Sequence, residues 1–256
     1  MNRTKEPTIY DEYLDLAIMA TYAINAVGSE THRAEDTGFR ILQAYGMKEI
    51  EVFVLTRFLS ISFLAPDGYY YQGQKNVLNR SVNMQKLIEL NNLSRHITNT
   101  KPAPSDAIQQ FKEILNREDP PLWQEILICG FVGLGFTFML GGSLLACLYA
   151  FCIDVCLRLV LIPLKTVRAN SIFVNLVGGF IVSTLAYPAI FLGLESELGV
   201  IIPGSFMYLF PGISLTNSIR DIIQTDYLAG MTKLLETILT AMAVAAGSGM
   251  AITMFY

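Results

Sequence analysis

The feature that most constrains this chain is a series of long apolar runs in its second half. Runs without any Asp, Glu, Lys or Arg extend over residues 126–153, 171–194, 198–219 and 237–256. A helix rises about 1.5 Å per residue, so each run is long enough to cross a bilayer core about 30 Å thick. Because lipid offers an exposed backbone no hydrogen-bond partners, these runs predict membrane-spanning helices.

The first run belongs to a longer apolar stretch that is long enough for two helices. Between residues 122 and 164 the only charged residues are Glu125, Asp154 and Arg158, and Gly141-Gly142 lies near the middle. We expect a tight turn at these glycines, which adopt backbone conformations that other residues avoid. The sequence therefore predicts five spans, at about 122–140, 143–164, 171–194, 198–219 and 235–256.

Charges between the spans predict the orientation, because cytoplasmic loops carry an excess of Lys and Arg. Five spans with a cytoplasmic N-terminus and a periplasmic C-terminus place every flanking base inside, whereas four spans leave Lys165 and Arg168 outside. The start of the chain lacks the apolar stretch of a signal peptide. We therefore expect a multi-pass membrane protein whose N-terminus is in the cytoplasm. The bases are Lys112, Arg117, Lys165, Arg168, Arg220 and Lys233.

Residues 1–120 carry most of the charges and are expected to form a small soluble α+β domain. Apolar residues at helical spacing predict a helix over 10–27, and β-branched and aromatic residues over 50–64 predict one or two strands. A further strand is expected after the turn Pro66-Asp67-Gly68, and further helices over 31–45, 82–98 and 106–117. The predicted fold is mainly α: this soluble α+β domain, then a five-helix transmembrane bundle over 121–256 with a broken fourth helix.

Composition and motifs exclude several classes of function. The net charge is −4 and no long basic run is present, which argues against a nucleic-acid partner. The sequence has no HExxH, GxSxG, Walker or CxxC motif, so we predict no catalytic residue, no metal site and no cofactor.

The predicted fourth span has the most unusual chemistry. It contains Pro203-Gly204 and Pro211-Gly212, which weaken or break a helix, and broken helices in transporters expose backbone dipoles to substrates. A polar segment follows, in which Thr216 and Arg220 share one face and Asn217 and Asp221 share another. We expect these residues to line a substrate path, with Arg220 binding a carboxylate. The alternative is that Arg220 and Asp221 only mark the cytoplasmic end of the span.

Three further polar residues lie within predicted spans. Asp154 and Arg158 are four residues apart on one helix, and Asn175 lies in the third span. A structural ion pair is the simpler interpretation of Asp154 and Arg158, and a role for Asp154 in proton coupling is the sharper one. Asn175 is a lesser candidate of the same kind.

The soluble half contains one dense charged cluster on a predicted helix, His32, Arg33, Glu35 and Asp36. A structural network is the simpler interpretation, and an acid–base site is the alternative. Asn79 and Arg80 precede a later helix and could cap it or meet this cluster.

Four segments make the chain resemble a known family, the threonine/serine exporter (ThrE) family. It is most similar to the split branch, in which the N-terminal half is a separate protein of the YjjP type. The most specific segment is YLFPGISLTNSIRDIIQTDYLAG. The others are SETHRAEDT, VFVLTRFLSISF and NRSVNMQKLIELNNLSR.

This resemblance implies export of a small carboxylate-bearing metabolite, either threonine and serine or a dicarboxylate such as succinate. It also implies a second small membrane subunit that supplies the other half of the transporter, within a higher oligomer in the lipid bilayer. The alternative is a membrane-anchored enzyme or sensor with a hydrolase-like cytoplasmic domain. Five spans with an internal break are more than an anchor needs.

Overall fold

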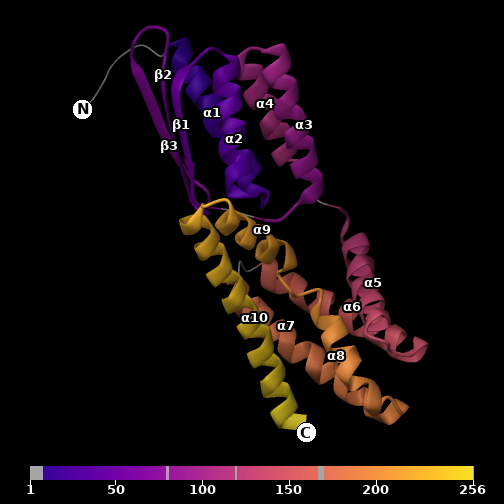
Figure 1. Cartoon of the computed structure of the whole chain (residues 1–256). Coiled ribbons are helices and arrows are strands. Elements are labelled where there is room, and N and C mark those ends of the chain that lie inside the picture. The colour runs from indigo at the N-terminus through magenta and orange to yellow at the C-terminus, as the bar shows by residue number, and fades with distance from the viewer. Residues whose placement is uncertain (1–7, 79–80, 119, 167–169, 256) are drawn as a thin grey trace. The chain divides into compact units, whose positions relative to one another are not determined.

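The computed structural model describes residues 8–78, 81–118, 120–166 and 170–255 (Figure 1). The chain divides into two compact units. The first comprises Met1–Glu118 with Ile213–Leu234, and the second comprises Asp119–Gly212 with Leu235–Tyr256. The expected boundary between soluble and membrane parts at residue 120 stays a prediction, because compactness does not show where a bilayer lies.

The first unit contains a three-stranded antiparallel meander, with strands in the order β1-β2-β3. The turn predicted at Pro66-Asp67-Gly68 joins the second and third strands, and the region 50–64 forms two strands. Hairpin pairing aligns Phe63 with Tyr71 and Val54 with Leu59. The bounds are β1 Lys48–Val54, β2 Phe58–Leu64 and β3 Tyr70–Asn76.

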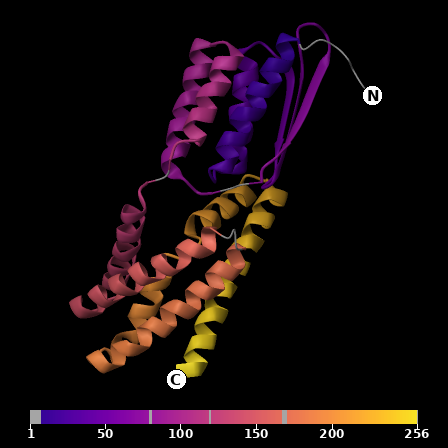
Figure 2. The same cartoon turned by 180° about the vertical axis from the view of Figure 1, so that it is seen from behind.

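Helices α1 (Ile9–Ala26) and α2 (Thr31–Ala44) cover one face of this sheet, and α3 (Met84–Thr100) and α4 (Pro104–Leu115) form a layer behind them (Figures 1 and 2). The inward residues of β2 alternate with outward ones, as in a strand with one buried face. Each large core side chain contributes about 1.5–3 kcal/mol when buried. Fully buried examples are Leu16, Ile24, Ile41, Leu59, Ile61, Phe63, Leu90, Ile97 and Phe111. Helices and a small sheet are thus both present here, as expected, whereas the solubility of this part stays a prediction.

Helix α9 (Gly212–Ile223) and the beginning of α10 (Tyr227–Phe255) also belong to the first unit. A turn at residues 224–226 joins them, and Thr225 has a positive φ of 71° there. A β-branched residue rarely adopts this conformation, so the turn is locally strained. The span predicted at about 235–256 lies within α10, which begins eight residues before that span.

The second unit contains α5 (Leu122–Met139), α6 (Leu144–Thr166), α7 (Ser171–Ala186) and α8 (Leu198–Phe206). Two short 3-10 helices, η1 (Tyr187–Leu192) and η2 (Glu195–Glu197), lie between α7 and α8. The predicted glycine turn joins α5 to α6, and Gly141 there has a φ of +89°. Large apolar side chains on α5, α6 and α10 are exposed, as expected for surfaces that face lipid.

Four helices are long and apolar enough to cross a membrane within the part of the chain that the structure describes. They extend over Leu122–Met139, Leu144–Leu164, Ser171–Leu192 and Tyr227–Phe255. The predicted fourth span, 198–219, is not one of them, because it forms α8 and α9 with residues 207–211 between them. Pro211 lacks the N–H that a continuous helix would need at the break.

Helices α7 and α10 approach each other so closely that their backbones touch. A Cβ atom added to Gly179 would lie 2.2 Å from the carbonyl oxygen of Val244, and one added to Gly247 would lie 1.9 Å from that of Leu176. Both distances are far below van der Waals contact, so only glycine fits. One turn further along, the hydroxyls of Ser183 and Ser248 are 2.7 Å apart and share a hydrogen bond.

Candidate functional site

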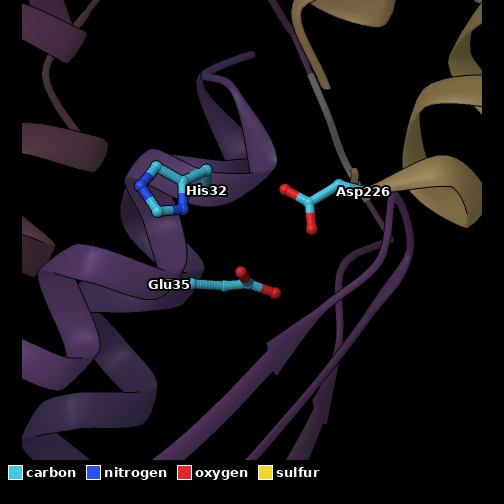
Figure 3. Close-up of side chains that lie close together, drawn as sticks. All are labelled: His32, Glu35 and Asp226. Carbon is cyan, nitrogen blue, oxygen red and sulfur yellow. The ribbon is translucent and has the colours of Figure 1, made fainter. Parts of the chain in front are cut away.

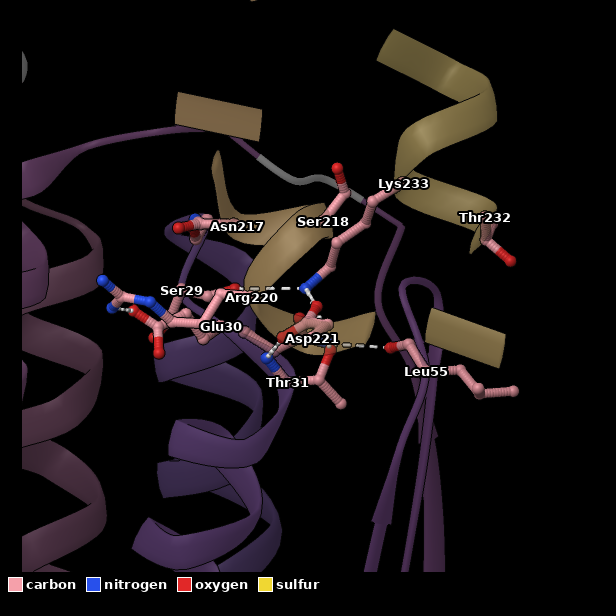
Figure 4. Close-up of polar contacts among 12 residues, drawn as sticks. Ser29, Glu30, Thr31, Leu55, Asn217, Ser218, Arg220, Asp221, Thr232 and Lys233 are labelled. Carbon is pink, nitrogen blue, oxygen red and sulfur yellow. Dashed lines mark hydrogen bonds and ion pairs between the residues drawn. The ribbon is translucent and has the colours of Figure 1, made fainter. Parts of the chain in front are cut away.

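The most connected polar group of the first unit is centred on Asp221, which has no exposed side-chain surface. Its carboxylate accepts hydrogen bonds from the backbone N–H and the hydroxyl of Thr31, both at 3.1 Å, and from the ammonium of Lys233 at 2.6 Å (Figure 4). Thr31 begins α2, so the carboxylate lies at a helix N-terminus, where a negative charge is favoured. The side chain of Lys233 is 2% exposed and also donates to the carbonyl oxygen of Ser29.

Two other residues of the predicted substrate path also contact the connection between α1 and α2. Asn217 donates a hydrogen bond of 3.0 Å to the carbonyl oxygen of Gly28. Arg220 forms an ion pair with Glu30, and its side chain remains 54% exposed. The polar faces of α9 therefore hold the α1–α2 turn in place (Figure 4).

The remaining residues of that prediction have simpler surroundings. Pro211 and Gly212 lie at the start of α9 and are partly buried, and Thr216 is exposed. The side-chain amide of Asn175 donates to the carbonyl oxygen of Ser171, one turn back on its own helix, at 2.8 Å. Such a local bond satisfies the amide within α7.

The second unit buries charges on α6. The four-residue spacing had indicated an ion pair between Arg158 and Asp154, but the two residues do not pair. The guanidinium of Arg158 instead pairs with Glu125 of α5. Asp154 has no exposed surface, and within the described part of the chain neither of its carboxylate oxygens has a hydrogen-bond partner. A Cβ atom on Gly133 would lie 2.3 Å from one of those oxygens, so the carboxylate fills the space that this glycine leaves on α5.

The charged cluster on α2 separates into two groups. Asp36 forms an exposed ion pair with Arg40, and Arg33 is exposed at the surface. His32 and Glu35 instead face Asp226, which comes from the turn between α9 and α10 (Figure 3). Asn79 and Arg80, expected to cap a helix or meet this cluster, lie outside the described residues.

Burial and like charge perturb the two carboxyl groups of this second group. Burial, together with repulsion from Asp226, raises the pKa of Glu35 to about 6, although a 2.9 Å hydrogen bond from the backbone N–H of Val54 opposes the shift. The pKa of Asp226 is also raised, first by burial and then by the nearby charge of Asp221. A cavity of about 570 Å³ lies beside His32 and Glu35 and is also lined by Phe39, Val52 and Ser62.

Sequence reasoning missed the partners of these groups. Thr31, Glu30 and Asp226 were not singled out, and Lys233 was used only as a topological charge. Thr31 and Asp221 are 190 positions apart, so no local spacing relates them. The acidic and basic residues of 220–233 were nevertheless a visible signal, because charges beside an apolar helix need partners or water.

Comparisons with known proteins give a consistent result. A profile of the family described as "Putative threonine/serine exporter" matches residues 15–255. A protein of Mycobacterium tuberculosis (strain ATCC 25618 / H37Rv) described as "Probable threonine/serine exporter" is 23% identical over 236 residues. The aligned region covers 91% of this chain and 44% of that relative, so the chain spans less than half of the relative's length. No solved structure matches the chain.

Proposed function

The chain belongs to the threonine/serine exporter family, and from this membership we propose that it is one subunit of an exporter of small carboxylate-bearing metabolites. Its apolar helices make it a multi-pass membrane protein. The observation that carries the proposal is the carboxylate of Asp154, which is buried among apolar helices and forms no ion pair with any residue that the structure describes. A charge at such a position is costly and is typical of ion and substrate pathways. The proposed substrates are threonine and serine or a dicarboxylate such as succinate.

We propose five crossings in a bacterial inner membrane, with the N-terminus in the cytoplasm and the C-terminus in the periplasm. The fourth crossing would consist of α8 and the non-helical residues 207–211. The nine residues of α8 rise only about 14 Å, so the other residues must complete the path. Non-helical backbone is tolerated at membrane depth where protein covers it, and Leu209 is buried against Gly178. Labelling of a cysteine placed at residue 168 from the periplasmic side would contradict this orientation.

We further propose that the chain belongs to the split branch and acts with a second small membrane subunit in a higher oligomer. The support is the resemblance of four segments to that branch, of which YLFPGISLTNSIRDIIQTDYLAG is the most specific. Proteoliposomes that hold this chain and such a companion should export threonine, serine or succinate. Proteoliposomes with either subunit alone should not. Export by this chain alone would contradict the two-subunit proposal, and no export of any of these substrates by the pair would contradict the exporter proposal.

We propose that the substrate carboxylate replaces Glu30 as the partner of Arg220. The same path would include Asn217, Asp221 and Thr216 on α9. Because the guanidinium of Arg220 is exposed beyond its contact with Glu30, a substrate can reach it. We expect Arg220→Ala to abolish export and Arg220→Lys to weaken it, since lysine keeps the charge but loses the two-pronged donor geometry.

The measurement is the export rate per correctly inserted molecule. The matched control is Glu30→Gln, which removes the competing carboxylate and leaves Arg220 in place, and which should retain export. Near-normal export by Arg220→Ala would exclude the substrate role and leave Arg220 as a residue that only holds the α1–α2 turn.

A further inference from the structure

One group of side chains in the first unit has no part in the proposed transport path. His32 and Glu35 are three residues apart on α2 and therefore share one face of that helix. Asp226 lies opposite them, in the turn that leads into α10. One ligand atom from each of the three residues lies within 4.8 Å of the other two, and Figure 3 shows the three side chains converging on a common space.

The two carboxylates keep coordination sites available in this arrangement. Glu35 uses one oxygen to accept the backbone N–H of Val54, which fixes the direction of the side chain and leaves the other oxygen for a ligand. One oxygen of Asp226 is buried and has no hydrogen-bond partner in the part of the chain that is described. A buried polar atom without a partner is costly in a native structure and calls for a ligand, an ion or a water molecule.

The charges of the group are also unbalanced. Within the described residues no lysine or arginine forms an ion pair with Glu35 or Asp226. The ammonium of Lys233 is engaged by Asp221, Thr31 and Ser29. Two carboxylates thus face each other with only one imidazole between them, and a bound cation would supply the missing positive charge.

We propose that His32, Glu35 and Asp226 bind one divalent transition-metal cation of the Zn²⁺ or Mn²⁺ type. An imidazole with two carboxylates suits these ions, whereas Mg²⁺ and Ca²⁺ prefer sets of oxygen ligands only. Three protein ligands leave at least one position for water or for a small ligand from the adjoining cavity. Bonds of about 2.1 Å require ligand atoms about 3–3.5 Å apart, so the three side chains close together slightly on binding.

Binding would join α2 to the turn between α9 and α10. That turn is already strained at Thr225, and the cation would hold it through the next residue, Asp226. The site would therefore stabilise the place where the candidate membrane helix α10 begins. This proposal does not depend on the identity of the exported substrate, nor on export itself.

The test uses the whole chain, purified in detergent and stripped of metal with EDTA. Isothermal titration with ZnCl₂ and with MnCl₂ should show one saturable site, and thermal unfolding should shift to higher temperature as the metal is added. Asp226→Asn and His32→Gln should each weaken binding of the preferred ion by at least about tenfold. Co²⁺ serves as a spectroscopic probe, and its visible absorption bands should be lost in both variants.

Two matched controls are available. The sequence has only two histidines, and the second, His96, is exposed on α3, so His96→Gln should bind metal as the unchanged chain does. Asp36→Asn removes a carboxylate from the same helix but one that is paired with Arg40, so it should also leave binding unchanged. In EDTA, Asp226→Asn should be at least as stable as the unchanged chain, because it removes repulsion between two carboxylates, and a loss of binding then cannot be attributed to misfolding.

Each outcome decides the proposal. Loss of binding in the His32 and Asp226 variants, with both controls intact, supports the site. Equal affinity in Asp226→Asn and in the unchanged chain overturns it, as does loss of binding in His96→Gln. Binding of Mg²⁺ as tight as that of Zn²⁺ or Mn²⁺ overturns the assigned class of metal, and no saturable binding of any of these ions overturns the site itself.

Discussion

Replacing Lys233 with methionine is expected to destabilise the first unit by about 3–5 kcal/mol, because the substitution leaves the Asp221 carboxylate buried without its cation. The hydrogen bonds from Thr31 remain, but they do not neutralise the charge. Methionine has nearly the length of the lysine side chain, so the loss reports on charge and not on a cavity. The measurement is the free energy of unfolding, obtained by denaturant titration of the protein in detergent.

A second substitution separates the charge effect from other causes. The double variant Lys233→Met with Asp221→Asn removes both charges, and it should recover more than half of the lost stability. The neighbouring pair Arg220–Glu30 is the matched control, since it joins the same helix to the same turn but is partly exposed. Glu30→Gln should cost at most about 1 kcal/mol. Equal losses for the buried and the exposed pair would show that burial is not the deciding factor.

Asp154→Asn is expected to reduce coupled export at least about tenfold without reducing the amount of folded protein. The carboxylate is buried in the helices of the second unit and has no ion pair with the described residues, so its ionised form is costly and its removal should not harm the fold. Asparagine keeps the shape but cannot release or accept a proton. If Asp154 carries the coupling proton, the variant should also stop the proton movement that accompanies export.

Two glycines of α5 provide a matched comparison for this prediction. Gly133→Ala would place a methyl group 2.3 Å from an Asp154 oxygen and should displace the carboxylate, so export should fall although no charge has changed. Gly135, two residues further along, has nothing within 4 Å of its added Cβ, and Gly135→Ala should export normally. Export by Asp154→Asn at the rate of the unchanged chain would remove Asp154 from the mechanism.

Local signals in the sequence predicted most of the secondary structure. Periodic apolar residues and the turn at Pro66-Asp67-Gly68 each act over a few positions, and the helices and strands they predicted are present within a few residues. The turn at Gly141-Gly142 was predicted in the same way, since only glycine adopts its backbone conformation easily.

The sequence was less informative about what α9 contacts. Helices α8 and α9 are separate at Pro211, whereas hydrophobicity alone had joined them into one broken span, and that fourth span stays a prediction. The polar residues Asn217 and Asp221 were expected to face a substrate because polar groups within a membrane are costly. That role stays a proposal, and nothing in the sequence indicated that they also contact Gly28 and Thr31, because such long-range hydrogen bonds leave no local pattern. The pairing of Arg158 with Glu125 was missed for the same reason, because Asp154 was the only acidic residue at a local helical spacing from Arg158.

The contact between α7 and α10 limits which amino-acid substitutions such a chain can accept during evolution. Where two helices meet through carbonyl oxygens and glycine Cα atoms, the interface is made of atoms common to every amino acid. It therefore demands glycine at Gly179 and Gly247, and it places few requirements on the side chains around them. Mutations elsewhere on the two helices can accumulate without separating them, whereas a single added methyl group at either glycine forces the helices apart.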